Sequence, residues 1–406
     1  MPDPPPVGRD RAASGILSNY EGGRFTEAPY STAMAHASAS PPDTAAPGQQ
    51  PDVADPAPLG RAPRAVALIS GGLDSMLAAR VVQAQGVEVH GLNFFTGFCV
   101  EGHTHAIRKQ RQDKPRRNNA LWVAEQLGIK LHIVDIVEDY KQVVLNPKHG
   151  YGAHLNPCLD CKIFMVNRAL EWMREHDFDF IITGEVMGQR PMSQRKDLMP
   201  VVARESGAED RLLRPLCARN LPPTLPERAG WVDRGRLYGW SGRSRKPQMA
   251  LAAQQGFTDY AQPAGGCCFL TDASYSVKLQ DLWAFRGQRA YELDDILLLK
   301  VGRHLRPRPH FKLIVAREEG ENRYLEGYRR QFTHLLPSSH LGAMALVDGE
   351  LRDDGDAELA ARIVARYSQG REAGMVEVEL HPLGGAPRVL RVAPLHPDEI
   401  PAAWQV

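Results

Sequence analysis

Residues 65–77 read AVALISGGLDSML, an apolar strand pattern that runs directly into two adjacent glycines and then into a helix pattern. Adjacent glycines let the backbone turn tightly with its N–H groups exposed, and the following helix directs its positive N-terminus at the same point. Such a turn can cradle an anion. It differs from the nucleoside-triphosphatase loop, which ends in Gly-Lys-Ser/Thr, and from the spaced-glycine dinucleotide fingerprint. The alternative interpretation is a Gly-Gly turn that holds no ligand.

Strand and helix patterns alternate from Arg64 onward, which predicts an α/β fold with a doubly wound parallel sheet and helices on both faces. Ligands of such sheets bind beyond the carboxyl ends of the strands. We therefore expect Ser70–Ser75, Phe94–Thr96 and Thr183–Glu185 to converge on one crevice. The predicted order is strand 66–70, helix 76–85, strand 87–95, helix 118–127, strand 130–136, helix 162–176 and strand 179–185.

The domain organisation follows from length and composition. The chain has 406 residues, 43% of them hydrophobic and 24% charged, so it can bury a substantial core and is expected to form two folded domains. Residues 1–63 are rich in Ala, Pro, Ser and Gly, and they bury too little apolar surface to offset the entropy of ordering, which predicts a disordered tail. We place a catalytic domain at 64–284 and a small α+β domain at 285–406.

The same sequence excludes several classes of protein. No apolar run approaches the roughly 20 residues that span a bilayer, and the N-terminus lacks the basic start and apolar segment of a secretory signal. These patterns predict a cytoplasmic protein with no membrane partner. The net charge is only +1, so nucleic-acid binding would have to come from a local basic face.

The cysteines suggest a metal centre. Cys158 and Cys161 lie in the run NPCLDCK, where two intervening residues let both sulfurs reach one metal from the start of a helix. A CxxC pair also occurs as a redox dithiol or as inert structural cysteines. The run PAGGCC at 263–268 places another thiol on a glycine-rich turn, where backbone can pack closely against a cofactor. Cys99 and Cys217 are interpreted as ordinary core thiols.

We favour a [4Fe–4S] cluster held by Cys158, Cys161 and Cys267. Three cysteine ligands leave one corner open, which can hold an exogenous hydrosulfide or the sulfur atom to be delivered. Zinc, with Cys268 closing the site, and a catalytic dithiol are the alternatives.

The loop Ser70–Ser75 resembles the SGGxDS loop of the PP-loop ATP pyrophosphatase superfamily. Members of that superfamily bind the pyrophosphate end of ATP and transfer AMP to a substrate. From Arg64 to about Asp272 the chain is similar to its tRNA thiolation group, the 4-thiouridine synthases and 2-thiouridylases. The matching segments are SGGLDS (70–75), NPCLDCK (156–162), ITGEVMGQRPMSQ (182–194), LRPLCARNLPPT (213–224), SGRSRKPQ (241–248) and PAGGCCFLTD (263–272).

This resemblance implies that ATP with Mg²⁺ transfers AMP to a carbonyl oxygen of a tRNA nucleobase, which sulfur then displaces. The implied catalytic residues are Asp74, which positions Mg²⁺ or the loop, and Cys158, Cys161 and Cys267, which present sulfide. Without a cluster, Cys158 or Cys267 would carry a persulfide. The sulfur donor is free sulfide or a cysteine desulfurase. The implied ATP ligands are Ser70, Gly71, Gly72, Asp74, Ser75, Phe94, Thr183 and Gly184.

Basic residues near the crevice are candidates for contact with ATP phosphates or with the RNA backbone. A solvated charged loop is the alternative interpretation, because aromatic platforms for single-stranded nucleic acid are not obvious. These candidates are Arg190, Arg195, Lys196, Arg243, Arg245 and Lys246.

After Leu282 the pattern changes to that of a compact α+β domain, with a terminal hairpin around Gly384-Gly385. The region resembles the RNA-binding module of NFACT proteins. Arg303, Arg306 and Arg308 in its first hairpin then imply a platform for the phosphate backbone. A dimerisation or purely structural domain is the alternative. Predicted strands are 296–307, 310–317, 342–349, 375–380 and 388–394, with helices at 321–332 and 356–367.

Three functions follow from these patterns. The first is an ATP-dependent tRNA sulfurtransferase with a three-cysteine iron–sulfur centre. The second is a PP-loop ligase or amidotransferase that adenylates a small molecule and uses zinc structurally. The third is a non-catalytic RNA-binding protein with a degenerate nucleotide fold, against which the intact Ser70–Ser75 loop argues.

Overall fold

The computed structural model describes residues 60–100, 118–260 and 267–406. Most of the predicted tail, residues 1–59, lies outside the described residues, as does the 263–266 part of the glycine-rich turn. None of the helices within the described ranges is long and apolar enough to cross a membrane.

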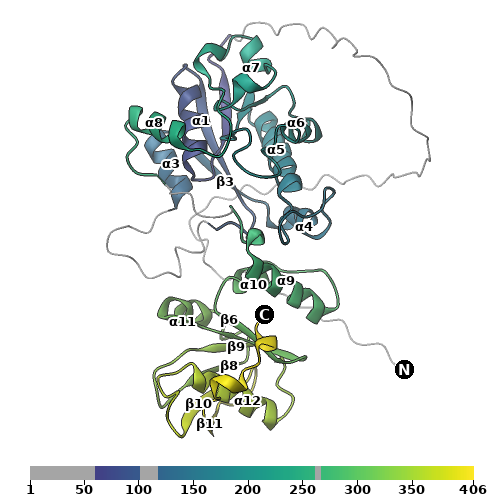
Figure 1. Ribbon diagram of the computed structural model, residues 1–406, viewed down its shortest axis with the longest axis vertical. Helices are drawn as coiled ribbons and strands as arrows, with labels where there is room; N and C mark the ends of the chain where they lie inside the picture. Colours follow the sequence, from purple (N-terminus) through teal and green to yellow (C-terminus); the bar gives the residue numbers. More distant parts are fainter. Residues whose placement is uncertain (1–59, 101–117, 261–266) are drawn as a thin grey trace, which may run out of the picture. The chain divides into compact units, whose positions relative to one another are not determined.

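A five-stranded parallel sheet forms the first part of the fold, as the alternating pattern predicted (Figure 1). The strand order is β3-β2-β1-β4-β5, so β1 lies at the centre. All neighbouring strands run parallel, which brings their carboxyl ends to one edge. The strands are β1 (Arg64–Leu68), β2 (Glu88–Phe95), β3 (Leu131–Asp135), β4 (Phe180–Ile182) and β5 (Leu212–Leu213).

Helices cover both faces of this sheet (Figure 1). Alternate residues of β1 point to opposite faces, so that Ala65 packs in the core beneath one helical layer and Val66 in the core beneath the other. The first layer contains α1 (Leu73–Gln83), α3 (Asn119–Leu127) and α8 (Lys246–Gln254). The second contains α5 (Cys158–Glu175) and α6 (Met199–Glu205), and the described residues of this region also form α4 (Val137–Leu145) and α7 (Leu225–Arg228).

Two helices begin earlier than their sequence patterns predicted. Helix α1 begins at Leu73, because Gly72 in an extended conformation serves as its N-cap. Helix α5 begins at Cys158, directly after Pro157. Since α5 precedes β4 in a parallel crossover, its N-terminus lies at the same edge as the carboxyl ends of the strands.

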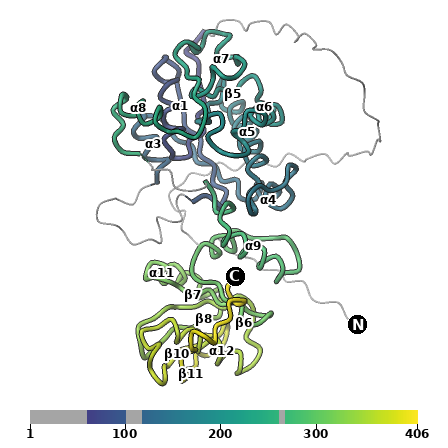
Figure 2. The backbone as a smooth tube through the Cα atoms, in the orientation of Figure 1, coloured from purple at the N-terminus to yellow at the C-terminus, as the bar shows by residue number. Residues whose placement is uncertain are grey.

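A second, antiparallel sheet follows, in the order β11-β10-β8-β9-β7-β6 (Figure 2). The α+β prediction is confirmed, and β10 and β11 form the expected hairpin with Gly384 at positive φ. The strands are β6 (Arg303–Arg308), β7 (Phe311–Val315), β8 (His334–Pro337), β9 (Ala345–Gly349), β10 (Val376–His381) and β11 (Arg388–Val392). The helices are α9 (Ala273–Arg286), α10 (Leu293–Leu298), α11 (Glu319–Glu326) and α12 (Asp354–Arg366). Short 3₁₀ helices occupy 218–220, 234–236, 269–271, 397–399 and 402–404.

Two predictions in this region were wrong. The apolar run that begins at Ile296 was predicted as the start of a strand, but it forms the end of α10, whose N-terminus is closed by a capping box between Glu292 and Asp295. Strand β8 was missed, because its four residues are too short to show alternation.

A half-buried histidine, His132, predicts how stability depends on pH. Burial lowers the pKa of His132 to about 4, with Lys130 and His90 adding to the effect. In the unfolded chain this pKa is about 6.5. The neutral form is therefore favoured by folding, and the contribution of His132 to stability is complete above about pH 6.5 and is lost as the pH falls towards 4.

We expect His132→Gln to show a smaller loss of unfolding free energy between pH 6.5 and 4 than the wild type, measured by urea denaturation at each pH. The control is His396→Gln, an exposed histidine on the surface. Equal slopes in all three proteins would contradict the assignment.

Candidate functional site

The loop between β1 and α1 has the geometry that its sequence predicts. Gly71 has a φ of +78°, which a residue with a Cβ rarely adopts, and Gly72 is extended. The Ser75 hydroxyl donates to the Gly72 carbonyl at 2.8 Å and lies 3.4 Å from the Ser70 hydroxyl. The result is a short closed turn at the positive N-terminus of α1, a geometry that suits an anionic ligand.

The turn after β4 packs directly against this loop. A Cβ on Gly184 would lie 2.5 to 2.6 Å from the Asp74 carbonyl group and would also overlap the Ser75 amide nitrogen. Only glycine fits at such a separation. Thr183 and Gly184 therefore lie beside the loop, as the sequence predicted from strand order alone.

The next residue, Glu185, is a buried carboxylate that connects three segments. Its Oε2 accepts hydrogen bonds from Thr183 Oγ1 at 2.8 Å and from Arg214 Nε at 3.0 Å, and Lys162 Nζ lies 3.9 Å from Oε1. Burial opposes ionisation of Glu185, but the charges of Lys162 and Arg214 outweigh it and lower its pKa. This ionic group joins the start of α5 to the turn beside the loop. The sequence analysis did not single out Glu185 as an ion-pair partner.

Asp74 takes part in a polar network. Its Oδ2 accepts from Gln189 Nε2 at 2.7 Å and pairs with the Arg245 guanidinium at 3.3 Å. Gln189 in turn accepts from Gln248 Nε2 at 2.7 Å. Of these four residues, Asp74, Gln189 and Arg245 are candidates from the sequence, and Gln248 is added by the structure.

Cys158 and Cys161 both lie in the first turn of α5, at the positive end of the helix dipole. Cys158 Sγ lies 3.4 Å from Ser193 Oγ. Burial nevertheless raises the pKa of the Cys161 thiol to about 12, with Cys267 and Cys158 adding to the effect and a hydrogen bond from Tyr140 opposing it. The CxxC pair thus lies at the carboxyl edge of the sheet with Cys267 nearby.

The second cysteine run joins this group through a short antiparallel bridge. Cys99 and Cys268 are direct partners in the bridge, which is held by hydrogen bonds from Phe269 N to Phe98 O and from Val100 N to Cys267 O. A hydrogen bond with Cys268 lowers the pKa of the exposed Cys267 thiol. Cys99, interpreted from sequence as a core thiol, therefore lies beside the Cys267-Cys268 run. Its position just past the carboxyl end of β2 was the signal that could have identified it.

Among the residues that the structure describes, no group of three His, Cys, Asp or Glu side chains is arranged to hold a metal ion. The chemistry of the donors is nevertheless suitable, because thiolates select zinc and iron–sulfur clusters. Cys217 is separate from this group: its buried thiol donates to the Glu185 carbonyl at 3.2 Å, and burial raises its pKa to about 12.

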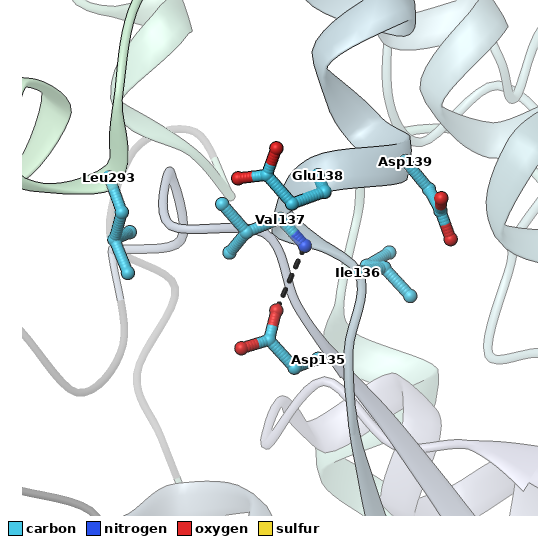
Figure 3. Close-up of a pocket in the computed structure, with 6 residues that line it drawn as sticks. All are labelled: Asp135, Ile136, Val137, Glu138, Asp139 and Leu293. Atoms are coloured by element: carbon cyan, nitrogen blue, oxygen red, sulfur yellow. Dashed lines mark hydrogen bonds between the residues drawn. The ribbon is translucent and has the colours of Figure 1, made fainter. Parts of the chain in front are cut away.

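Phe94 and a nearby pocket lie at the same edge of the sheet. The Phe94 side chain is buried in the core beneath α5. A pocket of about 300 Å³ adjoins the carboxyl end of β3 and is lined by Asp135, Asp139, Glu138 and neighbours (Figure 3). The Asp135 carboxylate accepts a hydrogen bond from the Val137 amide. Because this pocket carries three carboxylates, it is unsuited to a triphosphate.

The basic candidates near the loop differ in their surroundings. Arg190, Lys196, Arg243 and Lys246 are exposed. Arg195 is also exposed and forms an ion pair with Asp197 at 2.7 Å, whereas Arg245 contacts Asp74.

In the second sheet, the predicted basic platform is partly neutralised. Arg306 forms two hydrogen bonds with Asp281, at 2.5 and 2.7 Å, so its charge is already paired. Arg303 is exposed, and the Arg308 side chain is 57% exposed with Asp356 4.0 Å away. Arg303, whose guanidinium lies 4.9 Å from the centre of the Tyr367 ring, and Arg308 are the more exposed cations of the three.

Comparisons with known protein families match two separate parts of the chain. Residues 63–202 match the family described as the tRNA methyl transferase HUP domain. Residues 302–405 match the NFACT protein RNA binding domain.

The chain is also similar to curated tRNA-specific 2-thiouridylases named MnmA. The protein from Pelobacter propionicus is 33% identical over 122 residues, which are 29% of this chain and 31% of that protein. The Mesoplasma florum protein is 26% identical over 229 residues, 52% of this chain and 57% of that protein. Among solved structures, a 4-thiouridine synthetase in complex with RNA and bound ATP is 20% identical to this chain. The match covers 50% of this chain and 55% of that one, with a TM-score of 0.29.

The close contact at Gly184 yields a prediction. We expect Gly184→Ala to displace the Ser70–Ser75 loop and to lower affinity for an anionic ligand, tested with ATP, by at least about tenfold, because the new methyl group overlaps the backbone of Asp74 and Ser75. Equilibrium binding of ATP to the full chain measures this. The matched control is Gly374→Ala, since a Cβ there has no neighbour within 4 Å. Unchanged affinity in Gly184→Ala would place the ligand elsewhere.

Proposed function

Because this chain joins a PP-loop domain of the HUP class to an NFACT-type RNA-binding domain, we propose that it is an ATP-dependent tRNA sulfurtransferase. In this proposal the enzyme transfers AMP to a carbonyl oxygen of a tRNA nucleobase and then replaces that oxygen with sulfur.

One observation carries the proposal: an anion-binding loop and several thiols occupy the same edge of one sheet. The loop Ser70–Ser75 is in contact with Gly184, and the adjacent Glu185 is paired with Lys162, one residue after Cys161. A nucleotide-binding protein needs no thiols at this place. A sulfur-transfer enzyme needs them within reach of the activated carbon.

The activation step follows from the leaving group. A carbonyl oxygen of uracil or cytosine leaves poorly, but once it carries AMP it leaves as a phosphate ester. The amides of Gly71 and Gly72 with the Ser70 and Ser75 hydroxyls would bind the departing pyrophosphate. Mg²⁺ would neutralise its charge, with Asp74 as the carboxylate beside the loop.

For sulfur delivery we propose Cys158, Cys161 and Cys267 as the ligands of a [4Fe–4S] cluster. When bound, such a cluster would supply an open iron that holds sulfide. A hydrogen bond with Cys268, together with the charges of Arg190 and Lys162, lowers the pKa of the Cys267 thiol and so favours the thiolate form that ligation by this residue requires. Free sulfide or a cysteine desulfurase would be the sulfur donor. Zinc on the same cysteines, in an adenylating ligase, is the competing assignment.

Metal and sulfide analysis tests the centre. After anaerobic purification we expect about four irons and four sulfides per chain. These should be lost in Cys158→Ala, Cys161→Ala and Cys267→Ala and retained in Cys217→Ser, where the hydroxyl can still donate to Glu185. Stoichiometric zinc that also disappears in Cys268→Ala would instead favour the ligase.

A product assay tests the reaction itself. With ATP, Mg²⁺, a sulfide source and tRNA lacking thiolation, we expect AMP and a nucleoside heavier by the exchange of oxygen for sulfur, identified by mass spectrometry. If the enzyme instead releases AMP from ATP in the absence of tRNA, when a carboxylate and an amine are supplied, this result would contradict a sulfurtransferase.

The second domain gives a separate prediction. We expect the double variant Arg303→Ala/Arg308→Ala to weaken tRNA binding at all sequences and to reduce the slope of log K against log salt by about 2. Filter binding over a salt series measures this. The control is Arg323→Ala, an exposed arginine paired with Glu319 on α11. An unchanged slope would assign this domain a dimerisation or structural role.

A further inference from the structure

Asp74 occupies a place where a carboxylate is unfavourable once a nucleotide binds. It lies in the first turn of α1, beside the amides that would bind pyrophosphate. An incoming triphosphate repels this carboxylate unless a cation lies between them. Asp74 therefore needs a positive partner in both the free and the nucleotide-bound protein. In the structure without nucleotide that partner is Arg245, whose guanidinium nitrogen lies 3.3 Å from Asp74 Oδ2.

The polar network around Asp74 is incomplete. Asp74 Oδ1, Arg245 Nε and Gln248 Oε1 are inaccessible to solvent and have no hydrogen-bond partner. They are three of the nine such side-chain atoms in the described part of the chain. Buried polar atoms are normally paired, so their concentration here points to partners that a ligand supplies.

The backbone around Arg245 is anchored at two points. Gly242 N donates to Met187 O at 2.8 Å, and Ser241 pairs with Met187 in a parallel bridge. On the other side, Gln248 is fully buried and bonded to Gln189. The Arg245 side chain can therefore change partner while its backbone stays in place.

We propose that Arg245 is a nucleotide-responsive phosphate ligand that is held on Asp74 until Mg²⁺ and ATP arrive. Asp74 would hold Mg²⁺ in place of the guanidinium, and the released guanidinium would donate its Nε and terminal N–H groups to phosphate oxygens. Gln189, fixed by Gln248, keeps the Asp74 carboxylate in position through the exchange. This inference rests on the proposed ATP site.

Equilibrium binding of ATP to the full chain tests the exchange, with Mg²⁺ and with EDTA. We expect Arg245→Ala to weaken binding of ATP with Mg²⁺ by about 10- to 100-fold, as loss of charge-assisted hydrogen bonds implies. Asp74→Asn should bind ATP in EDTA more tightly than the wild type, because it releases Arg245 and removes the repulsion. That gain should vanish in Asp74→Asn/Arg245→Ala.

The controls separate this exchange from a structural role. Arg204→Ala removes an exposed arginine on α6 and should bind as the wild type does. Arg245→Lys keeps the charge without the guanidinium fork and should fall between wild type and Arg245→Ala, which remains informative if the alanine variant fails to fold. Wild-type affinity in Arg245→Ala, or a gain that persists in the double variant, would overturn the exchange alone. A wild-type chain that binds no ATP would overturn the proposed function as well.

Discussion

The close packing of Gly184 against Asp74 and Ser75 is the contact on which the site depends. It brings the turn after β4 against the loop after β1 at a separation that excludes any Cβ. The neighbouring Glu185 then extends the same turn to Lys162 at the start of α5 and to Arg214 after β5. Two adjacent residues thus connect the Ser70–Ser75 loop, the cysteine helix α5 and the edge of the sheet.

Burying Glu185 is costly unless its charge is matched, because a carboxylate loses its hydration in the interior. Arg214, Lys162 and the Thr183 hydroxyl supply the compensation, and together they keep the carboxyl group ionised. The hydrogen bonds from Thr183 and Arg214 to Oε2 are directional, and the charge of Lys162, 3.9 Å from Oε1, connects the start of α5 to the same carboxylate.

The second sheet shows why a count of basic residues overestimates a nucleic-acid surface. Lys312 is buried between Asp281 and Asp348, and Arg306 is bound by the same Asp281. These cations stabilise the packing of α9 against the first hairpin. Sequence cannot show this, because Asp281 lies 25 residues from Arg306 and 31 from Lys312 along the chain.

The sequence by itself determined the layered α/β fold, the Ser70–Ser75 loop and the edge of the sheet at which that loop lies, because each follows from local patterning and parallel strand geometry. It also placed the CxxC pair at a helix start. Only the tertiary structure decided which distant groups meet: Arg245 with Asp74, and Cys99 with Cys268. These pairings depend on how loops return to the sheet edge. The sequence does not reveal them, because partners that lie far apart along the chain leave no periodic signal.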